Sequence, residues 1–207
     1  MRGKLPIPII SNGHGGMIAG EYQTAGKRSP IWSDGTVLYE GEFNRAIKSR
    51  VIELLNLAQI PYIDLVEEAE DIPRHTRVMW ANDWHNKKYL NTFLIDVHAN
   101  AAAVFLKGRA KGSEVFISRK ASKNSHVLAN FCQGLYHAHF PSESWRGIKK
   151  RNFDMVHLTR MPAVLLECFF MDNERECKTY LMSKDGRSRI AQWIFDVIVS
   201  YRKYHEK

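Results

Sequence analysis

The chain has 207 residues, of which 44% are hydrophobic, 25% charged and 11% aromatic, a composition that excludes a disordered or fibrous protein. No apolar run reaches the roughly 18–20 residues of a membrane span, and the first residues lack the apolar stretch of a signal peptide. Three scattered cysteines are too few for a disulfide framework and indicate synthesis in a reducing compartment. We therefore expect one domain over residues 1–207, without membrane insertion.

The net charge of +8 comes from one segment, Lys107 to Arg151, which holds ten Lys or Arg residues against two Glu residues. The rest of the chain balances at twenty basic and twenty acidic residues. Such a basic field attracts polyanions, among them nucleic acid, an anionic membrane surface or a cell-wall polymer, whereas a solvated surface is the alternative. Because no RNP motif, zinc finger or helix-turn-helix accompanies the charge, nucleic acid is not expected as a partner.

The first half of the chain alternates short apolar strands with helices. In chain order we expect a strand (6–11), a glycine-rich turn (12–16), a polar loop (17–39), a helix (42–59), a strand (61–66), an acidic loop (67–71), a helix (76–90) and a strand (93–97). The first helix is predicted from apolar residues at helical spacing, from Phe43 to Ala58. Thr76 is the expected N-cap of the second helix.

The second half continues the same alternation. We expect a strand (115–118), a helix (122–139), a loop (141–151), an apolar strand (163–166) with Glu167 near its end, and an amphipathic helix (187–204). Short, near-continuous apolar strands between helices predict an α/β fold. The expected architecture is a single-domain three-layer sandwich, with a twisted, mostly parallel sheet flanked by helices.

Three of the predicted strands stop on unusual polar residues, which are His14, His98 and Glu167. If these strands are parallel neighbours, the three side chains converge outside their carboxyl ends. Two histidines and a carboxylate suit a zinc ion with an open position for water. A lone histidine after a strand is more often structural, but a carboxylate in an apolar run is rarely buried without a partner.

Glu40 and Glu42 are both candidates for a third ligand. Glu40 lies one helical turn before Phe43, on the face that points toward the core, whereas Glu42 lies closer to the solvent side. A core-facing carboxylate at a helix start can point into the crevice above the sheet. Helical geometry therefore favours Glu40, and Glu42 stays the alternative.

At these residues the sequence resembles the zinc-dependent N-acetylmuramoyl-L-alanine amidases of the amidase-3 family. The motifs that carry the resemblance are Gly13-His14-Gly15-Gly16, Glu40 before an apolar helix, His98-Ala99-Asn100-Ala101 and the late strand ending in Leu166-Glu167. The resemblance implies one zinc ion held by His14, Glu40 and His98, with Glu167 as the catalytic carboxylate. Ser11-Asn12 replaces the usual Asp-Pro or Asp-Ala, and Cys168-Phe169 replaces the usual Gly-Phe.

The resemblance also implies the reaction, which is hydrolysis of the amide between N-acetylmuramic acid and L-alanine in peptidoglycan. Glu167 would take a proton from the attacking water and later protonate the leaving amine. Two residues flank His98 in its motif. Asp96 is expected on the opposite strand face in a structural role, and Asn100 is expected either to bind substrate or to fix the turn.

Two other functions fit parts of this pattern. Strand-end histidines alone would also suit another zinc hydrolase, such as a peptidase or deacetylase, and the basic segment alone would suit a non-catalytic wall-binding protein. For the amidase we expect a monomer that acts on the cell wall, in the periplasm or outside the cell. It would be either a phage-type lysin, cytoplasmic before release, or a bacterial remodelling enzyme.

Overall fold

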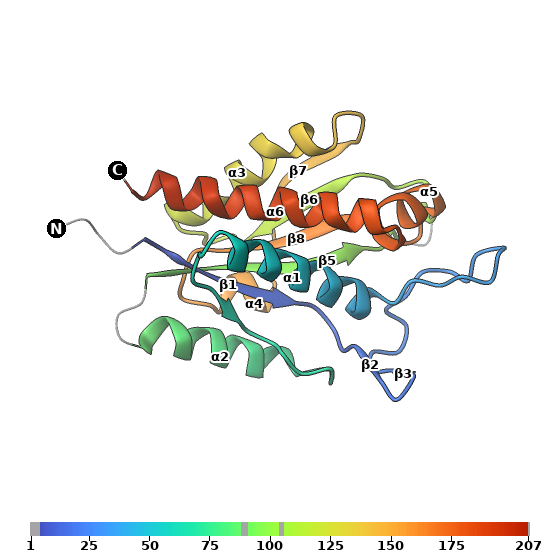
Figure 1. Ribbon diagram of the computed structural model, residues 1–207, viewed down its shortest axis with the longest axis horizontal. Helices are drawn as coiled ribbons and strands as arrows, with labels where there is room; N and C mark the ends of the chain where they lie inside the picture. The colour runs from blue at the N-terminus through green and yellow to red at the C-terminus, as the bar shows by residue number, and fades with distance from the viewer. Residues whose placement is uncertain (1–4, 88–90, 104–105, 207) are drawn as a thin grey trace.

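A computed structural model of the chain describes residues 5–87, 91–103 and 106–206, with a six-stranded sheet between layers of helices (Figure 1). The strands in sheet order are β4 (Ile63–Asp64), β1 (Ile7–Asn12), β5 (Thr92–Asn100), β8 (Ala163–Phe170), β6 (Ser113–Ile117) and β7 (Trp145–Lys150). Neighbouring strands are parallel except β8 and β6, which are antiparallel. The predicted α/β sandwich with a mostly parallel sheet is confirmed.

Helices cover both faces of this sheet and bury two apolar clusters. The larger cluster packs one face against α1 (Glu40–Leu57), α3 (Lys123–His139) and α6 (Lys184–Tyr204). The smaller cluster packs the other face against α2 (Arg74–Asn86) and α4 (Asp154–His157). A short helix α5 (Glu174–Glu176) and a π-helical turn (Cys177–Met182) lead from β8 into α6.

The sheet face under α2 and α4 changes from apolar to polar toward the carboxyl ends of its central strands. Successive residues on one face of a strand are two apart, so Leu94 and Asp96 share this face, as do Leu165 and Glu167. Leu94 and Leu165 belong to the smaller apolar cluster. The covered core therefore ends where the polar residues begin, and the site described below lies at that boundary.

The clearest differences from the sequence-based expectations concern three segments. The loop predicted at 141–151 contains the edge strand β7, in which half of the residues are charged and the side chains are partly or fully exposed, so no apolar pattern indicated a strand. The loop predicted at 17–39 contains a hairpin of β2 (Met17–Ile18) and β3 (Glu21–Tyr22). The second helix begins at Arg74 after Pro73, so Thr76 lies inside it and is not its cap; the predicted end of this helix, Leu90, lies outside the described residues.

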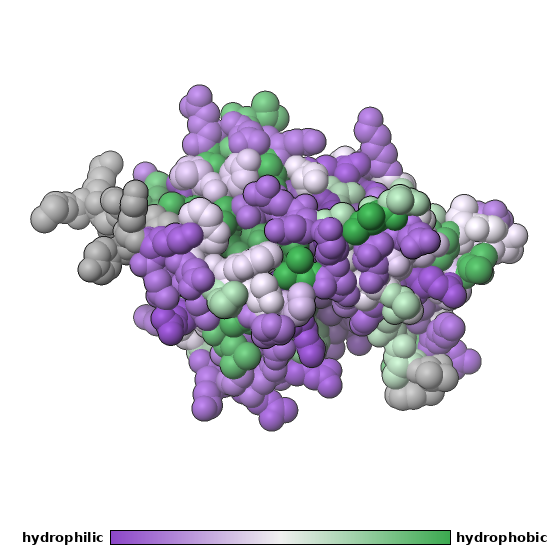
Figure 2. Space-filling view, turned by 90° about the horizontal axis from the view of Figure 1, so that it is seen from below, coloured by the Kyte–Doolittle hydropathy of each residue, from purple (hydrophilic) through white to green (hydrophobic). Residues whose placement is uncertain are grey.

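Among the described helices, none is both long enough and apolar enough to cross a membrane. The face of the molecule seen from below is mostly hydrophilic, with apolar residues scattered over it singly or in small groups (Figure 2). Single exposed apolar residues are normal on a folded protein.

Candidate active site

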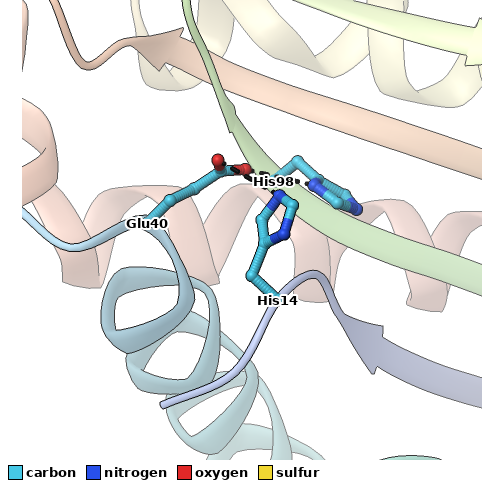
Figure 3. Close-up of side chains that lie close together, drawn as sticks. All are labelled: His14, Glu40 and His98. Atoms are coloured by element: carbon cyan, nitrogen blue, oxygen red, sulfur yellow. Dashed lines mark hydrogen bonds and ion pairs between the residues drawn. The ribbon is translucent and has the colours of Figure 1, made fainter. Parts of the chain in front are cut away.

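Three neighbouring parallel strands and one helix bring the predicted site residues together. His14 follows β1 in the glycine-rich turn, His98 lies in β5, Glu167 lies in β8, and Glu40 is the first residue of α1. Figure 3 shows His14, Glu40 and His98. His98 and Glu167 are paired in the register of β5 and β8. The two strands continue to Asn100 and Phe170. His98 and Glu167 therefore lie inside strands, whereas the sequence predicted that the strands stop just before these residues.

His14, Glu40 and His98 form a group that could hold a metal ion, because their ligand atoms all lie within 4.8 Å of one another. Glu40 is at the centre: Oε2 is 3.2 Å from Nε2 of His14, and Oε1 is 3.1 Å from Nδ1 of His98. The Glu40 side chain is only 3% exposed, and those of the histidines are 19% and 16% exposed. A buried carboxylate thus lies between two imidazoles that still reach the cavity.

Two glycines make room for this arrangement. A Cβ atom on Gly13 would lie 1.9 Å from Cε1 of His98, so the imidazole packs directly against the Gly13 backbone. A Cβ atom on Gly41 would lie 1.8 Å from the carbonyl oxygen of Gly15, so the turn packs against the first residues of α1. A side chain at position 13 would displace the His98 ring, and one at position 41 would push α1 away from the turn, which explains the need for glycine at both positions.

The turn itself holds His14 in a left-handed conformation, with φ of 64°. This region is unfavourable for a residue with a side chain and persists where the surroundings enforce it. Arg45 donates from Nη1 to the His14 carbonyl (2.7 Å), and the Gly15 N–H donates to Oγ1 of Thr24 (2.7 Å). Thr24 in turn donates to Asp71 at 2.7 Å. Both hydrogen bonds hold the peptide unit between His14 and Gly15, and so they fix the backbone from which the imidazole projects.

Glu42, the alternative third ligand, has a different partner. Its two carboxylate oxygens accept hydrogen bonds from Nη1 and Nη2 of Arg187, both at 2.7 Å. This bidentate ion pair joins α1 to α6. Glu40 is therefore the carboxylate that the structure brings to the two histidines, and Glu42 belongs to a helix–helix contact.

The buried charges shift the pKa values of Glu40 and His98 strongly. Burial raises the pKa of Glu40, but hydrogen bonds from His14 and His98 outweigh it and hold the pKa below its usual range. Burial lowers the pKa of His98, but Asp96 and Glu40 outweigh it and raise the pKa well above its ordinary value. Without a metal ion, the cationic form of His98 is thus favoured by its two carboxylate neighbours.

Glu167 is in a different electrostatic situation, because among the described residues no cationic side chain forms an ion pair with it. Burial raises the pKa of Glu167 to about 8, the charge of His98 opposes this rise, and the nearby carboxylates of Glu40 and Glu114 add to it. Its Oε2 atom is buried with no hydrogen-bond partner among the described residues. A carboxylate with a raised pKa and a free oxygen at a cavity is suited to accept and donate a proton.

Glu114 on β6 is a residue of this region that sequence analysis missed. It pairs with Glu167 in the register of β6 and β8 and is 4% exposed. One oxygen accepts from Nδ2 of Asn100 (2.9 Å), and the other accepts from Arg146 (2.6 Å) and Lys149. The oxygen of the Asn100 side chain accepts the Ala101 N–H at 2.9 Å, so this amide holds the following backbone at its oxygen end and Glu114 at its nitrogen end. The signal was present in the sequence, since Glu114 is one of two acids in the basic segment.

The site opens into a cavity of about 850 Å³ between the sheet and the starts of α2 and α4. Its lining includes His14, Glu40, His98, Glu167 and Asp96. The expectation that Asp96 lies on the opposite strand face is wrong. Asp96 and His98 are two residues apart and share a face, and their side chains are in contact at 3.2 Å.

Cys168-Phe169, which stands where the family usually has Gly-Phe, also has an unusual backbone conformation. Phe169 adopts a left-handed φ of 58° directly after the Glu167–Cys168 pair, where the pairing of β5 and β8 shifts its register. The Phe169 ring is fully buried and stacks on Tyr180, with ring centroids 4.2 Å apart. Burial of an aromatic ring offsets the cost of this conformation, so the bulge next to Glu167 is kept without a glycine.

Comparison with known proteins bears on this site. The family model for N-acetylmuramoyl-L-alanine amidase (Amidase_3) matches residues 9–200. The chain belongs to this family. The resemblance to this family is thereby confirmed, and the predicted enzyme class is the one that describes the family.

Relatives and solved structures agree with this assignment. A cell wall amidase of Bacillus anthracis, itself uncharacterised, is 28% identical over 203 residues, which make up 95% of this chain and 35% of that protein. The chain thus spans about a third of the length of this curated relative. The catalytic domain of the amidase CwlV from Bacillus (Paenibacillus) polymyxa has a TM-score of 0.75 and 25% identity, covering 95% of this chain and 97% of that one. An amidase from Clostridium difficile 630 has the same fold, with a TM-score of 0.78 and 22% identity over 96% of this chain and 97% of that one.

The raised pKa of Glu167 predicts how pH affects the metal-free protein. The ordinary pKa of 4.5 applies to the unfolded chain, and the folded value is about 8, so the folded state binds this proton more tightly. The stability contributed by the proton is fully present below about pH 4.5 and is lost as the pH rises through about 8. Glu167→Gln has no such proton to lose, so the metal-free variant should gain stability relative to the wild type across this range.

Urea denaturation of chelator-treated wild type and Glu167→Gln, repeated at several pH values, measures this difference. The free energy of unfolding of the variant minus that of the wild type should increase from pH 5 to pH 8. A difference that stays constant over this range would contradict the assigned burial of Glu167.

Proposed function

We propose that this chain is a zinc-dependent peptidoglycan hydrolase that cleaves the amide bond between N-acetylmuramic acid and L-alanine. The observation that supports this most is the contact of Glu40 with both His14 and His98, next to Glu167 at one cavity. His14, Glu40 and His98 are the proposed metal ligands, and Glu167 is the proposed catalytic residue. The whole chain would act as one catalytic domain and as a monomer.

The residues present fit a zinc ion by their chemistry and spacing. Two imidazoles and one carboxylate are a ligand set typical of catalytic zinc, which keeps an open position on the side of the substrate. Two ligands about 2.0–2.1 Å from a tetrahedral zinc ion are roughly 3.3 Å apart. The N···O distances of 3.1 and 3.2 Å around Glu40 are close to that separation.

A bound zinc ion would supply a Lewis acid that polarises the scissile carbonyl and lowers the pKa of a water molecule. The residues of the chain supply the proton transfers. Glu167 accepts the proton of the attacking water and then delivers it to the nitrogen of the leaving L-alanine. The pKa of about 8 in the metal-free site would fall next to a bound cation, which brings Glu167 closer to the range of a general base at neutral pH.

The basic segment from Lys107 to Arg151 is the proposed contact with the anionic wall. Arg146 and Lys149 are already engaged with the buried Glu114. Lys150 and Arg151 at the end of β7 are exposed. A peptidase or deacetylase would use the same metal group, but family membership favours the amidase, and we propose that it acts at the cell wall.

Zinc content should distinguish the two acidic residues at the start of α1. Glu40→Ala removes the carboxylate between the histidines, so the purified variant should lose zinc. Glu42→Ala is the matched control, because it removes an equal charge two residues away and breaks only the ion pair with Arg187. Elemental analysis after dialysis measures the zinc content of both variants. Full zinc occupancy in Glu40→Ala would show that Glu40 is not a ligand.

Replacement of the proposed proton carrier should separate catalysis from metal binding. Glu167→Gln keeps the volume and polarity of the side chain but cannot take up the proton of water. Because general acid–base catalysis contributes typically about 10²–10⁴ in rate, we expect amidase activity to fall by that factor while zinc content stays that of the wild type. Release of stem peptide from purified muropeptides measures the rate, and near-normal turnover would disprove this role.

A further inference from the structure

His98 lies between two carboxylates, and only one of them belongs to the proposed ligand set. Its Nδ1 atom is 3.1 Å from Oε1 of Glu40, and its Nε2 atom is 3.2 Å from Oδ2 of Asp96. Asp96 is 1% exposed and comes from the same face of β5 as His98. Each ring nitrogen of His98 therefore has its own carboxylate oxygen within hydrogen-bond distance.

We propose that Asp96 is a positioning residue that accepts the Nε2–H of His98 and so directs the Nδ1 lone pair toward the metal site. A neutral imidazole carries one proton, so the nitrogen that donates to Asp96 determines which nitrogen is left to bind a metal. Carboxylates in this relation to a metal-binding histidine fix its tautomer and make it a stronger ligand. This inference rests on the proposed zinc site.

The surroundings of the ring support a positioning role. The imidazole packs against the backbone of Gly13, which leaves no room for even a Cβ atom, so the ring has little freedom to turn away from Asp96. Besides His98, Asp96 interacts with the charge of Arg77 and the hydroxyl of Ser11, and neither of these groups belongs to the proposed ligand set. Its second oxygen, Oδ1, is buried without a hydrogen-bond partner in the described part of the chain.

A purely structural role for Asp96 makes a different prediction. A buried carboxylate that served only the fold would affect the free energy of unfolding, and its removal would leave metal affinity unchanged. A carboxylate that orients a ligand should instead change the affinity for zinc in a protein that remains folded. The dissociation constant of zinc and the tautomer of His98 are therefore the informative quantities, and neither requires an activity assay.

The first experiment measures zinc affinity by competition with a chromophoric chelator in the wild type, Asp96→Ala and Asp96→Asn. Asp96→Ala should bind zinc about 10–100-fold more weakly, the range typical for loss of such a partner. Asp96→Asn should show a smaller loss, because its amide oxygen still accepts the hydrogen bond but lacks the charge. The control is Asp154→Ala, which removes a carboxylate from the same cavity that pairs with Arg74 and touches neither histidine; its zinc affinity should stay that of the wild type.

Nitrogen-15 NMR of the zinc-loaded wild type provides the second readout. His98 should have zinc on Nδ1 and a slowly exchanging proton on Nε2, and this proton should exchange faster in Asp96→Asn. Wild-type zinc affinity in Asp96→Ala, or in Asp96→Asn if the alanine variant does not fold, would overturn the inference, as would zinc on Nε2. A wild type that takes up no zinc would instead overturn the proposed function itself.

Discussion

The parallel pairing of β1, β5 and β8 sets the distances on which the whole site depends. The register of β5 and β8 places His98 beside Glu167, and the turn after β1 brings His14 to the same edge. The start of α1 packs closely on this turn, with the backbone of Gly41 against Gly15. This contact positions Glu40, the first residue of α1, between the two histidines. A shift of one residue in either strand would turn its site residue to the opposite face of the sheet.

This arrangement concentrates charge where a protein interior tolerates it poorly. Glu40 and Asp96 are nearly fully buried, and both depend on His98 for compensation. Burying charges is costly unless partners are close, so a group of this kind contributes to function at some expense of stability. Glu167 is buried without an ion-pair partner in the described part of the chain, and its burial raises its pKa. The same features that destabilise the free site would prepare it for a cation and for proton transfer.

Much of the fold and the site could be predicted from the sequence. Apolar strands that alternate with helices identified the sheet, and the polar residues that interrupt them, His98 and Glu167, marked the edge where the site lies. Helical periodicity also placed Glu40, and not Glu42, on the side facing the core. These features succeeded because each depends on local spacing along one strand or helix.

Other features depend on contacts between distant segments and could not be predicted in this way. The strand β7 was not predicted because it is a partly exposed edge strand in which half of the residues are charged. Glu114 and its partners come together only through the antiparallel pairing of β6 with β8. Asp96 is the exception, because the two-residue period of a strand places it on the same face as His98.

Mass spectrometry of a digest of purified muropeptides by the zinc-loaded protein tests the central claim most directly, because it identifies the bond that is cut. The account predicts two products: an intact disaccharide whose lactyl group ends in a free carboxyl, and a stem peptide that begins with a free L-alanine amine. Cleavage within the stem peptide, removal of an acetyl group, or cleavage between the two sugars would contradict it.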